Sequence, residues 1–285
     1  MLVDDMQNIE NIYTEAIKSG VSLGMLIEVN GGHNRCGIGV ASAPGGCDLL
    51  LAMAREIISR SPALRFRGIH CYNGALQHVR GAIDRRDRVF SGPVAAARTA
   101  VDALSAAGIA CPVITGGGTG SFRSEVEGGV HNEIQPGSYC FMDVDYGLND
   151  EKYSIFENAL FIHTRVISKA VDTNHRAVVD AGMKAISFDS GPPVAINGFL
   201  DGNDVVDGIT VLNGGDEHSI LMGAAVHQWN VGDTLRLIPG HIDPTVNMHN
   251  FIVVMDNGPL QLDGSPSGEP VVVDLWDVSG RGPGL

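Results

Sequence analysis

The first half of the chain alternates strand-like apolar runs with helical periodicity at nearly constant spacing. The runs at 23–29, 66–72 and 111–115 end in polar or glycine-rich residues, and Glu28, Tyr72 and Gly116 follow one another at intervals of 44 residues. The segments between them place apolar residues on one helical face. Strands that alternate with helices predict βαβ units and a parallel sheet, in which polar strand ends gather on one face.

Capping residues set the expected helix boundaries. Residues 5–19 are predicted to be helical, with Asp4 or Asp5 as the cap and Gly20 at the end. Residues 48–60 form a second expected helix. A third covers 92–107, with Ser91 as its cap and Pro93 in its first turn. The basic run at 85–90 is interpreted as a solvated helix face, and 131–137 as one more strand.

The character of the sequence changes near residue 150. From about residue 155 onward, short β-rich runs are separated by "NG", "DG", "GG" and "GP" turns, among them "KAISFD" at 184–189. Helical periodicity is scarce in this part. The chain is therefore expected to divide into an α/β domain at 1–150 and an all-β domain, a small barrel or sandwich, at 151–285.

Charge and cysteine usage exclude several classes of protein. The net charge is −14, which argues against binding to nucleic acid. Five cysteines without a CxxC pair are typical of a reduced, cytoplasmic protein. No uncharged apolar run approaches the length of a membrane span, and the amino-terminal residues lack the basic and apolar regions of a signal peptide.

Several loops after the predicted strands carry candidate binding residues. Arg35 lies in a glycine-rich loop, where its guanidinium can bind a phenolate or carboxylate or simply pair with a nearby acid. Tyr72, at a strand end, can stack on a flat ligand or serve packing alone. The loop "ITGGGTGS" at 114–121 contains Thr119, and its backbone N–H groups can converge on a phosphate. The segment "QPGSY" at 135–139 offers a second set of donors.

A histidine and an aspartate stand two residues apart in "RLIPGHIDPTVNMHNF". His241 and Asp243 are expected in or beside a strand, where residues i and i+2 project from the same face. A nitrogen and an oxygen ligand side by side suit Zn²⁺, Mn²⁺ or Mg²⁺. The alternative is a structural hydrogen bond between the two side chains.

Taken together, these motifs resemble those of the D-threonine aldolase / D-serine dehydratase-like family, whose members use pyridoxal phosphate on an alanine-racemase-like barrel. The resemblance runs from residue 28 to the end of the chain, through "GGHNRCGI", "GIHCYNGALQH", "TGGGTGS", "NEIQPGSYCFMDVDYG", "AVVDAGMKAISFDSGPP", "GDEH" and "DVSGRGPG". It implies that Arg35 contacts the phenolic oxygen of pyridoxal phosphate and that Tyr72 lies near its ring. The residues that it implies for the phosphate are Gly118, Thr119, Gly137 and Ser138.

The same resemblance implies that His241 and Asp243 bind a divalent metal. It implies an aldolase that cleaves a β-hydroxy-D-amino acid, 3-hydroxy-D-aspartate or D-threonine, to glycine and an aldehyde. In the related dehydratases a cysteine usually takes the second ligand position, so Asp243 favours the aldolase. Dehydration of D-serine or 3-hydroxyaspartate is the alternative reaction. The expected partner is the small amino-acid substrate, and the expected assembly is a homodimer.

The family's cofactor lysine has no counterpart among the four lysines of this chain. The resemblance places that lysine on the first barrel strand. None of the lysines of this chain occupies such a position; they are Lys18, Lys152, Lys169 and Lys184. The expected fold is therefore the second half of a (β/α)8 barrel followed by the all-β domain. A truncated, inactive chain that folds poorly, or a non-catalytic remnant that binds metal or pyridoxal phosphate, is expected on this basis.

Overall fold

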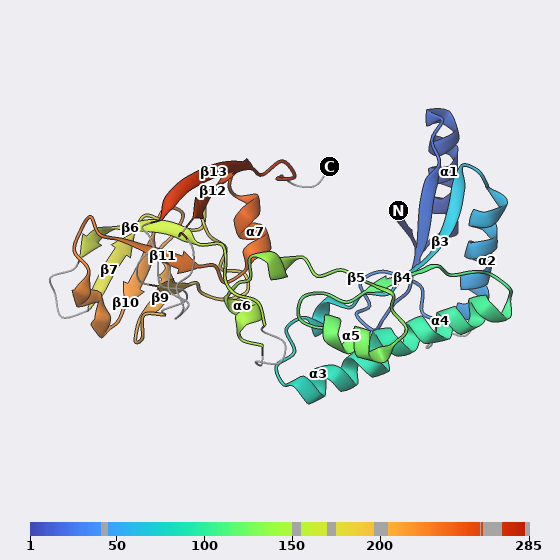
Figure 1. Ribbon diagram of the computed structural model, residues 1–285, viewed down its shortest axis with the longest axis horizontal. Helices are drawn as coiled ribbons and strands as arrows, with labels where there is room; N and C mark the ends of the chain where they lie inside the picture. The colour runs from blue at the N-terminus through green and yellow to red at the C-terminus, as the bar shows by residue number, and fades with distance from the viewer. Residues whose placement is uncertain are drawn as a thin grey trace. The chain divides into compact units, whose positions relative to one another are not determined.

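The computed structural model describes residues 1–40, 45–149, 155–169, 175–196, 205–256, 258 and 270–282 (Figure 1). The chain divides into two compact units. The first contains Met1–Gly137 and Asn149–Ile155, and the second contains Ser138–Leu148 and Phe156–Leu285. Ser138 therefore falls in the second unit, next to the last residue of the main segment of the first.

The first unit is built on a parallel sheet whose strands follow in chain order, which confirms the expected βαβ pattern. Its strands are β1 (Leu2–Val3), β2 (Leu23–Glu28), β3 (Leu64–His70), β4 (Val113–Gly116) and β5 (Glu133–Ile134). The helical segments are α1 (Met6–Ser19), α2 (Gly46–Ser59), η1 (Gly74–Leu76), α3 (Ala82–Val89), η2 (Phe90–Val94), α4 (Ala95–Ala106) and α5 (Phe122–Gly128).

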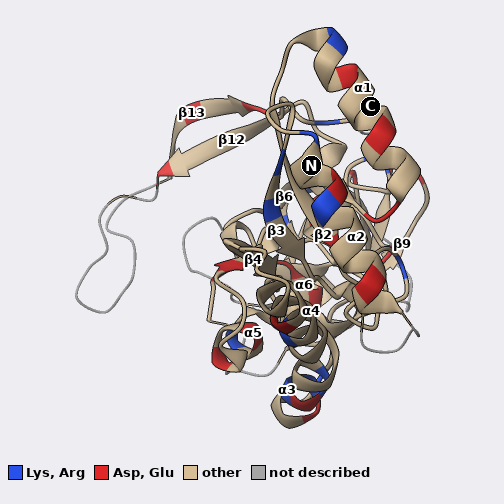
Figure 2. Cartoon of the chain, turned by 90° about the vertical axis from the view of Figure 1, so that its right-hand side faces the viewer, with Lys and Arg blue, Asp and Glu red and all other residues tan. Residues whose placement is uncertain are grey.

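Helix α1 begins and ends where its caps predict. The Asp5 carboxylate accepts a hydrogen bond from the Asn8 backbone N–H at 2.8 Å, and Gly20 ends the helix with a φ of +65°. Ile9 and Ala16 are buried, whereas Glu15 and Lys18 are exposed. Figure 2 shows the acidic and basic residues along α1. The sheet and these helices bury the apolar core of the unit: Met25, Ile27, Leu50, Met53, Ile57, Leu64, Ile69 and Leu104.

The expected start of the third helix is wrong. Ser91 does not cap it, because α3, the π-helical turn η2 and α4 follow one another without a break from Ala82 to Ala106. The π turn contains Pro93, and the Ser91 hydroxyl donates to the Asp87 carbonyl at 2.8 Å. The solvated face expected at 85–90 is also partly wrong. Arg85 is completely buried and donates to Asn149 Oδ1 at 3.0 Å.

The second unit is antiparallel, as the turn-separated runs predict. Its main sheet has the strand order β8-β11-β6-β7-β10-β9. An isolated antiparallel bridge between Ile196, in the edge strand β8, and Val205, which precedes the other edge strand β9, nearly closes this sheet into a barrel. The strands are β6 (Ile162–Lys169), β7 (Arg176–Val179), β8 (Val194–Ile196), β9 (Thr210–Asn213), β10 (Ser219–Met222) and β11 (Thr234–Ile238). A separate hairpin pairs β12 (Phe251–Asp256) with β13 (Val271–Asp277).

Among its described residues, the second unit also has four short helical segments. They are η3 (Ser138–Cys140), α6 (Val144–Gly147), η4 (Ala224–Gln228) and α7 (Ile242–Asn247). All five cysteines of the chain are free thiols. Among the residues that the structure describes, no helix has both the length and the apolar character needed to cross a membrane.

Candidate functional site

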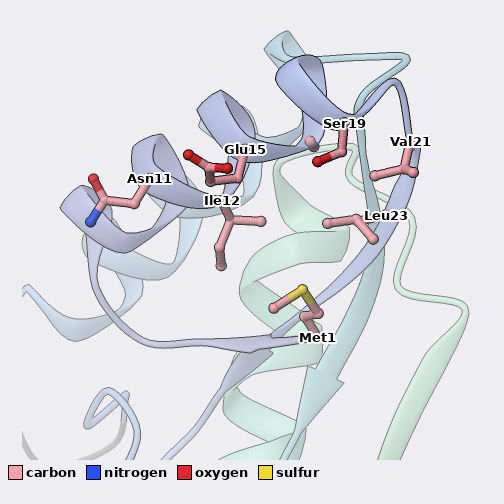
Figure 3. A pocket seen from close by; sticks show the side chains of 8 residues that line it. Met1, Asn11, Ile12, Glu15, Ser19, Val21 and Leu23 are labelled. Atoms are coloured by element: carbon pink, nitrogen blue, oxygen red, sulfur yellow. The ribbon is translucent and has the colours of Figure 1, made fainter.

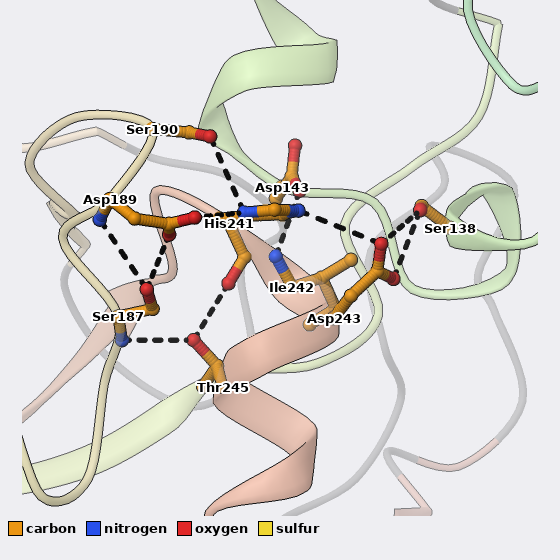
Figure 4. A network of polar contacts seen from close by, with 9 residues as sticks. All are labelled: Ser138, Asp143, Ser187, Asp189, Ser190, His241, Ile242, Asp243 and Thr245. Atoms are coloured by element: carbon orange, nitrogen blue, oxygen red, sulfur yellow. Dashed lines mark hydrogen bonds and ion pairs between the residues drawn. The ribbon is translucent and has the colours of Figure 1, made fainter. Parts of the chain in front are cut away.

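His241 and Asp243 lie at the start of helix α7 rather than on a strand. Strand β11 ends at Ile238, His241 occupies the extended N-cap position, and Asp243 falls in the first helical turn. The expected strand geometry is therefore wrong for this pair. Its consequence nevertheless holds, because the turn into the helix brings the two side chains together (Figure 4).

The separation of the two side chains suits a shared metal ion. His241 Nε2 and Asp243 Oδ2 are 3.6 Å apart, which is longer than a good hydrogen bond. Two ligand atoms at about 2.1 Å from one ion would lie roughly 3.0–3.4 Å apart, so a small movement would let both coordinate it. The residues described contain no group of three or more His, Cys, Asp or Glu placed to hold a metal. The pair would thus leave positions open for water or substrate.

Carboxylates on both sides of the imidazole favour its protonated form. The Asp243 carboxylate, followed by Asp189, raises the pKa of His241 to about 9, although partial burial opposes the shift. Asp189 Oδ2 is 2.8 Å from His241 Nδ1, and Ser190 Oγ is 3.3 Å from the same nitrogen. A divalent ion at Nε2 would replace that proton, so the donor set is compatible with a metal.

Sequence reasoning missed Asp189. The segment "KAISFD" was expected to be β-rich, but the structure contains no strand at 184–189 and forms turns there instead. The motif "FDSGPP" gave no chemical reason to single out one acid. Asp189 is 52 residues from His241 in the sequence, so only the fold brings the two together.

Two further residues of the second unit hold the Asp243 segment. The Ser138 hydroxyl donates to the Asp243 carboxylate, at 3.1 Å from Oδ1 and 3.4 Å from Oδ2. Asp143 is fully buried, and its carboxylate accepts from the backbone N–H groups of Ile242 and Tyr146 at 2.9 and 2.8 Å. Burial raises the pKa of Asp143, and these N–H groups oppose the rise. Ser138 was expected at a phosphate; here its hydroxyl contacts the candidate metal ligand.

In the first unit, Arg35, Tyr72 and Gly118 come together after three different strands. The Arg35 guanidinium carbon lies 5.7 Å from the centroid of the Tyr72 ring, within cation–π range. A Cβ on Gly118 would approach Tyr72 Cε2 to 3.1 Å and Gln77 Oε1 to 2.5 Å, so this close packing needs glycine. Thr119 is buried beside it. A Cβ on Gly137 would meet no atom within 4 Å.

A buried hydrogen-bond network fixes the glycine loop, residues 116–121, at the end of β4. Gln77 Oε1 accepts from the Gly120 N–H at 3.0 Å, and Gln77 Nε2 donates to Ser121 Oγ at 2.8 Å. Ser121 Oγ also accepts from the Gly118 N–H at 3.4 Å and donates to Glu125 Oε1 at 3.0 Å. Burial raises the pKa of Glu125 to about 7, although the hydrogen bond from Ser121 opposes this rise. Gln77 and Glu125 were also missed by sequence reasoning.

A histidine–glutamate pair at the ends of β3 and β2 lies beside Tyr72. His70 forms a buried ion pair with Glu28, and its Nε2 lies 2.8 Å from Gln135 Oε1. Burial lowers the pKa of His70, but the hydrogen bonds to Glu28 and Gln135 outweigh it, so the net shift is upward. The His70 and Tyr72 rings lie 6.2 Å apart between centroids. The Arg35 guanidinium beside the Tyr72 ring makes the cluster suitable for an anionic aromatic ligand.

These residues fit the phenolate and ring of pyridoxal phosphate, but the lysines described are engaged elsewhere. Lys18 pairs with Glu15, Lys184 pairs with Glu217, and Lys169 Nζ donates to the carbonyls of His227 and Trp229. Lys152 lies outside the described residues. The described residues therefore fit the non-covalent part of such a site, and none of the described lysines is placed to bind the cofactor covalently.

The first unit also has a pocket of about 390 Å³, lined by α1 and the start of β2 (Figure 3). Met1, Val21 and Leu23 in its wall precede or begin strands, whereas Arg35, Tyr72 and Gly118 follow strand ends. In a parallel α/β unit, ligands bind at the carboxyl ends of the strands. The pocket is therefore not the candidate site.

Comparison with known proteins found relatives that match nearly the whole chain. The family described as "Putative serine dehydratase domain" matches residues 159–255. A 3-hydroxy-D-aspartate aldolase of Paracoccus denitrificans (strain Pd 1222) is 39% identical over 288 residues, covering 99% of this chain and 66% of the relative. The chain thus spans about two thirds of that protein's length.

Solved structures extend the comparison to the fold. In the crystal structure of D-threonine aldolase from Filomicrobium marinum, the protein is 32% identical in sequence to this chain and the TM-score is 0.81. The match covers 98% of this chain and 68% of the aldolase chain. An alanine-racemase-like protein from Idiomarina loihiensis is 21% identical with a TM-score of 0.73, over 97% of this chain and 70% of its own. The second likeness shows the fold alone.

Proposed function

Because the chain belongs to the D-threonine aldolase / D-serine dehydratase-like family, we propose that it serves an aldolase that cleaves a β-hydroxy-D-amino acid to glycine and an aldehyde. The proposed substrates are 3-hydroxy-D-aspartate and D-threonine, which are the compounds named in the two aldolase relatives. The observation that carries the proposal is the pair His241 Nε2 and Asp243 Oδ2, 3.6 Å apart and each held by other side chains.

The chain's own residues would bind and orient two groups. His241 and Asp243 would hold a divalent ion through one nitrogen and one oxygen, with Mn²⁺, Mg²⁺ and Zn²⁺ as candidates. Arg35 would contact the phenolate of pyridoxal phosphate, Tyr72 would lie against its ring, and Gly118, Thr119, Gly137 and Ser138 would hold its phosphate. When bound, pyridoxal phosphate supplies an electron sink, and the metal supplies a Lewis acid for the substrate hydroxyl.

Asp243 is the residue that favours the aldolase within the family. A carboxylate is a harder ligand than a thiolate, so a His–Asp pair is better suited to Mn²⁺ or Mg²⁺ than a His–Cys pair. The match of residues 159–255 to a serine dehydratase domain supports dehydration as the second candidate. In that reaction the metal would assist the departure of hydroxide instead of the cleavage of the Cα–Cβ bond.

Product analysis separates these proposals. The 285-residue protein would be purified, supplied with pyridoxal phosphate and Mn²⁺, and incubated with D-threonine and 3-hydroxy-D-aspartate. Glycine and an aldehyde in equal amounts would support the aldolase, whereas ammonia and a keto acid would support the dehydratase. Binding of either cofactor without any product would favour a non-catalytic binding role for this chain over both reactions.

A further inference from the structure

Asp189 stands directly behind the candidate metal ligand His241. Its Oδ2 lies 2.8 Å from Nδ1, the ring nitrogen opposite the one that faces Asp243 (Figure 4). The other oxygen of Asp189 accepts a hydrogen bond from the Ser187 hydroxyl. Both oxygens of this carboxylate are thus engaged, which orients it toward the imidazole.

The contact at Nδ1 determines which nitrogen is available to a metal. An imidazole that donates its Nδ1–H to a carboxylate presents the lone pair of Nε2 on the other side of the ring. Here Nε2 is the atom that faces Asp243 at 3.6 Å. Ser190 Oγ also lies near Nδ1, but at 3.3 Å it is the longer contact and carries no charge.

The turn that carries Asp189 is tied to the start of α7. Thr245 Oγ1 donates to the His241 carbonyl at 2.7 Å and accepts from the Ser187 N–H at 3.1 Å. His249 Nε2 lies 2.8 Å from the Ala185 carbonyl oxygen, which adds a second link between the two segments. Asp189 and His241 are therefore held by backbone anchors on both sides, although the Asp189 side chain is 56% exposed.

We propose that Asp189 is a positioning residue of the metal site: it holds the His241 ring so that Nε2 and the Asp243 carboxylate can bind one divalent ion. This role rests on the proposed function in one respect, which is that a divalent ion binds to His241 and Asp243. Removal of a hydrogen-bond partner behind a metal-binding histidine typically weakens metal affinity by about 10- to 100-fold.

Mn²⁺ binding to the 285-residue protein is measured by the loss of the free-ion electron paramagnetic resonance signal. Asp189→Ala is expected to weaken binding by about 10- to 100-fold, and Asp189→Asn, which keeps an acceptor oxygen, by less. Ser190→Ala tests the longer contact and is expected to stay within about twofold. Asp207→Asn removes one charge from an exposed turn of the same unit and serves as the control.

A second readout separates ring positioning from general damage to the fold. With Co²⁺ bound, the Nδ1–H of His241 gives a paramagnetically shifted, exchangeable proton signal. That signal should be sharp in the wild type, lost to solvent exchange in Asp189→Ala, and restored in Asp189→Glu. Circular dichroism spectra of the metal-free variants that match the wild type would show that the fold is intact.

The outcomes distinguish the inference from the function on which it rests. If Asp189→Ala binds Mn²⁺ as tightly as the wild type, or if its Nδ1–H stays protected from exchange, the proposed role of Asp189 is wrong. The assignment of His241 and Asp243 as metal ligands would be unaffected. Failure of the wild type to bind either Mn²⁺ or Co²⁺ would overturn the metal assignment of the proposed function, and the role of Asp189 with it.

Discussion

At the scale of single residues, the choice of aspartate at position 243 decides which metals the site can hold. Asp243→Ala leaves only His241 of the proposed pair, and Mn²⁺ affinity should fall by at least about 100-fold, since one imidazole holds a labile divalent ion weakly. Asp243→Cys should shift preference from Mn²⁺ toward Zn²⁺, because a thiolate is the softer ligand. Competition titrations with the two metals measure both effects. Wild-type affinities in both variants would mean that the pair is structural.

The protonation of His241 gives metal binding a defined pH dependence. Its pKa is raised to about 9, so below that pH an incoming ion must displace a proton. Mn²⁺ affinity should therefore increase about tenfold per pH unit between roughly pH 6.5 and 8.5, with about one proton released per ion. Calorimetry in buffers of different ionisation enthalpy measures the proton count. An affinity independent of pH would contradict proton displacement at His241.

In the metal-free protein the same group stabilises the fold in the opposite pH direction. A histidine whose folded pKa is raised adds stability that is complete below its ordinary value of 6.5 and is lost as the pH rises through about 9. Metal binding and folding thus respond to this one imidazole with opposite signs. Comparison of the two pH profiles tests whether a single group controls both.

At the scale of elements, the glycine loop after β4 depends on backbone space that only glycine leaves. A Cβ on Gly120 would lie 1.8 Å from the Gln77 carbonyl oxygen. Gly120→Ala should therefore destabilise the first unit by roughly 2–4 kcal/mol, because the backbone itself must move. Chemical unfolding followed by circular dichroism measures the loss. Gly137→Ala, where a Cβ meets no atom within 4 Å, is the stability control and should change little.

Helix α5 contacts the same loop through a buried glutamate whose ionisation is unfavourable. Glu125 is completely buried, and its pKa is raised from 4.5 to about 7. The folded state then keeps a proton that the unfolded state loses, so stability should fall by up to roughly 3 kcal/mol as the pH rises from 4.5 to 7. In Glu125→Gln this pH dependence should be absent. Denaturation curves at several pH values measure the difference, and parallel profiles for the two proteins would contradict it.

Periodicity and caps predicted the regular elements well, and they failed where tertiary contacts override local signals. Asp5 and Gly20 end α1 as expected, because each acts within its own turn. Ser91 does not cap a helix, since the chain absorbs Pro93 in a π-helical turn and continues. His241 begins a helix of only six residues, which is too short to leave a periodic pattern. The spacing of two residues nevertheless predicted that the His241 and Asp243 side chains lie close together, as they do in the structure.

At the scale of the whole molecule, the parts of the site that sequence reasoning missed are those assembled over long distances. Asp189 reaches His241 across 52 residues, and Gln77 reaches Gly120 across 43. Neither has an intrinsic signal, because acids and amides are common in turns. The change from helical periodicity to turn-separated β-rich runs near residue 150 was readable, since it depends on the period of the apolar residues and not on any single contact.

The division into two units also predicts where a metal ion will be felt. His241, Asp243, Asp189 and Ser138 all belong to the second unit. An ion at 100 times its dissociation constant stabilises the state that binds it by about 2.7 kcal/mol. Added Mn²⁺ should therefore slow amide hydrogen exchange in the second unit, most strongly around 138–148, 187–190 and 241–245, and leave the glycine loop at 116–121 nearly unchanged. Exchange measured by mass spectrometry resolves these segments. Equal protection of both units would mean that the ion binds elsewhere, and Asp243→Ala supplies the control in which the local protection should disappear.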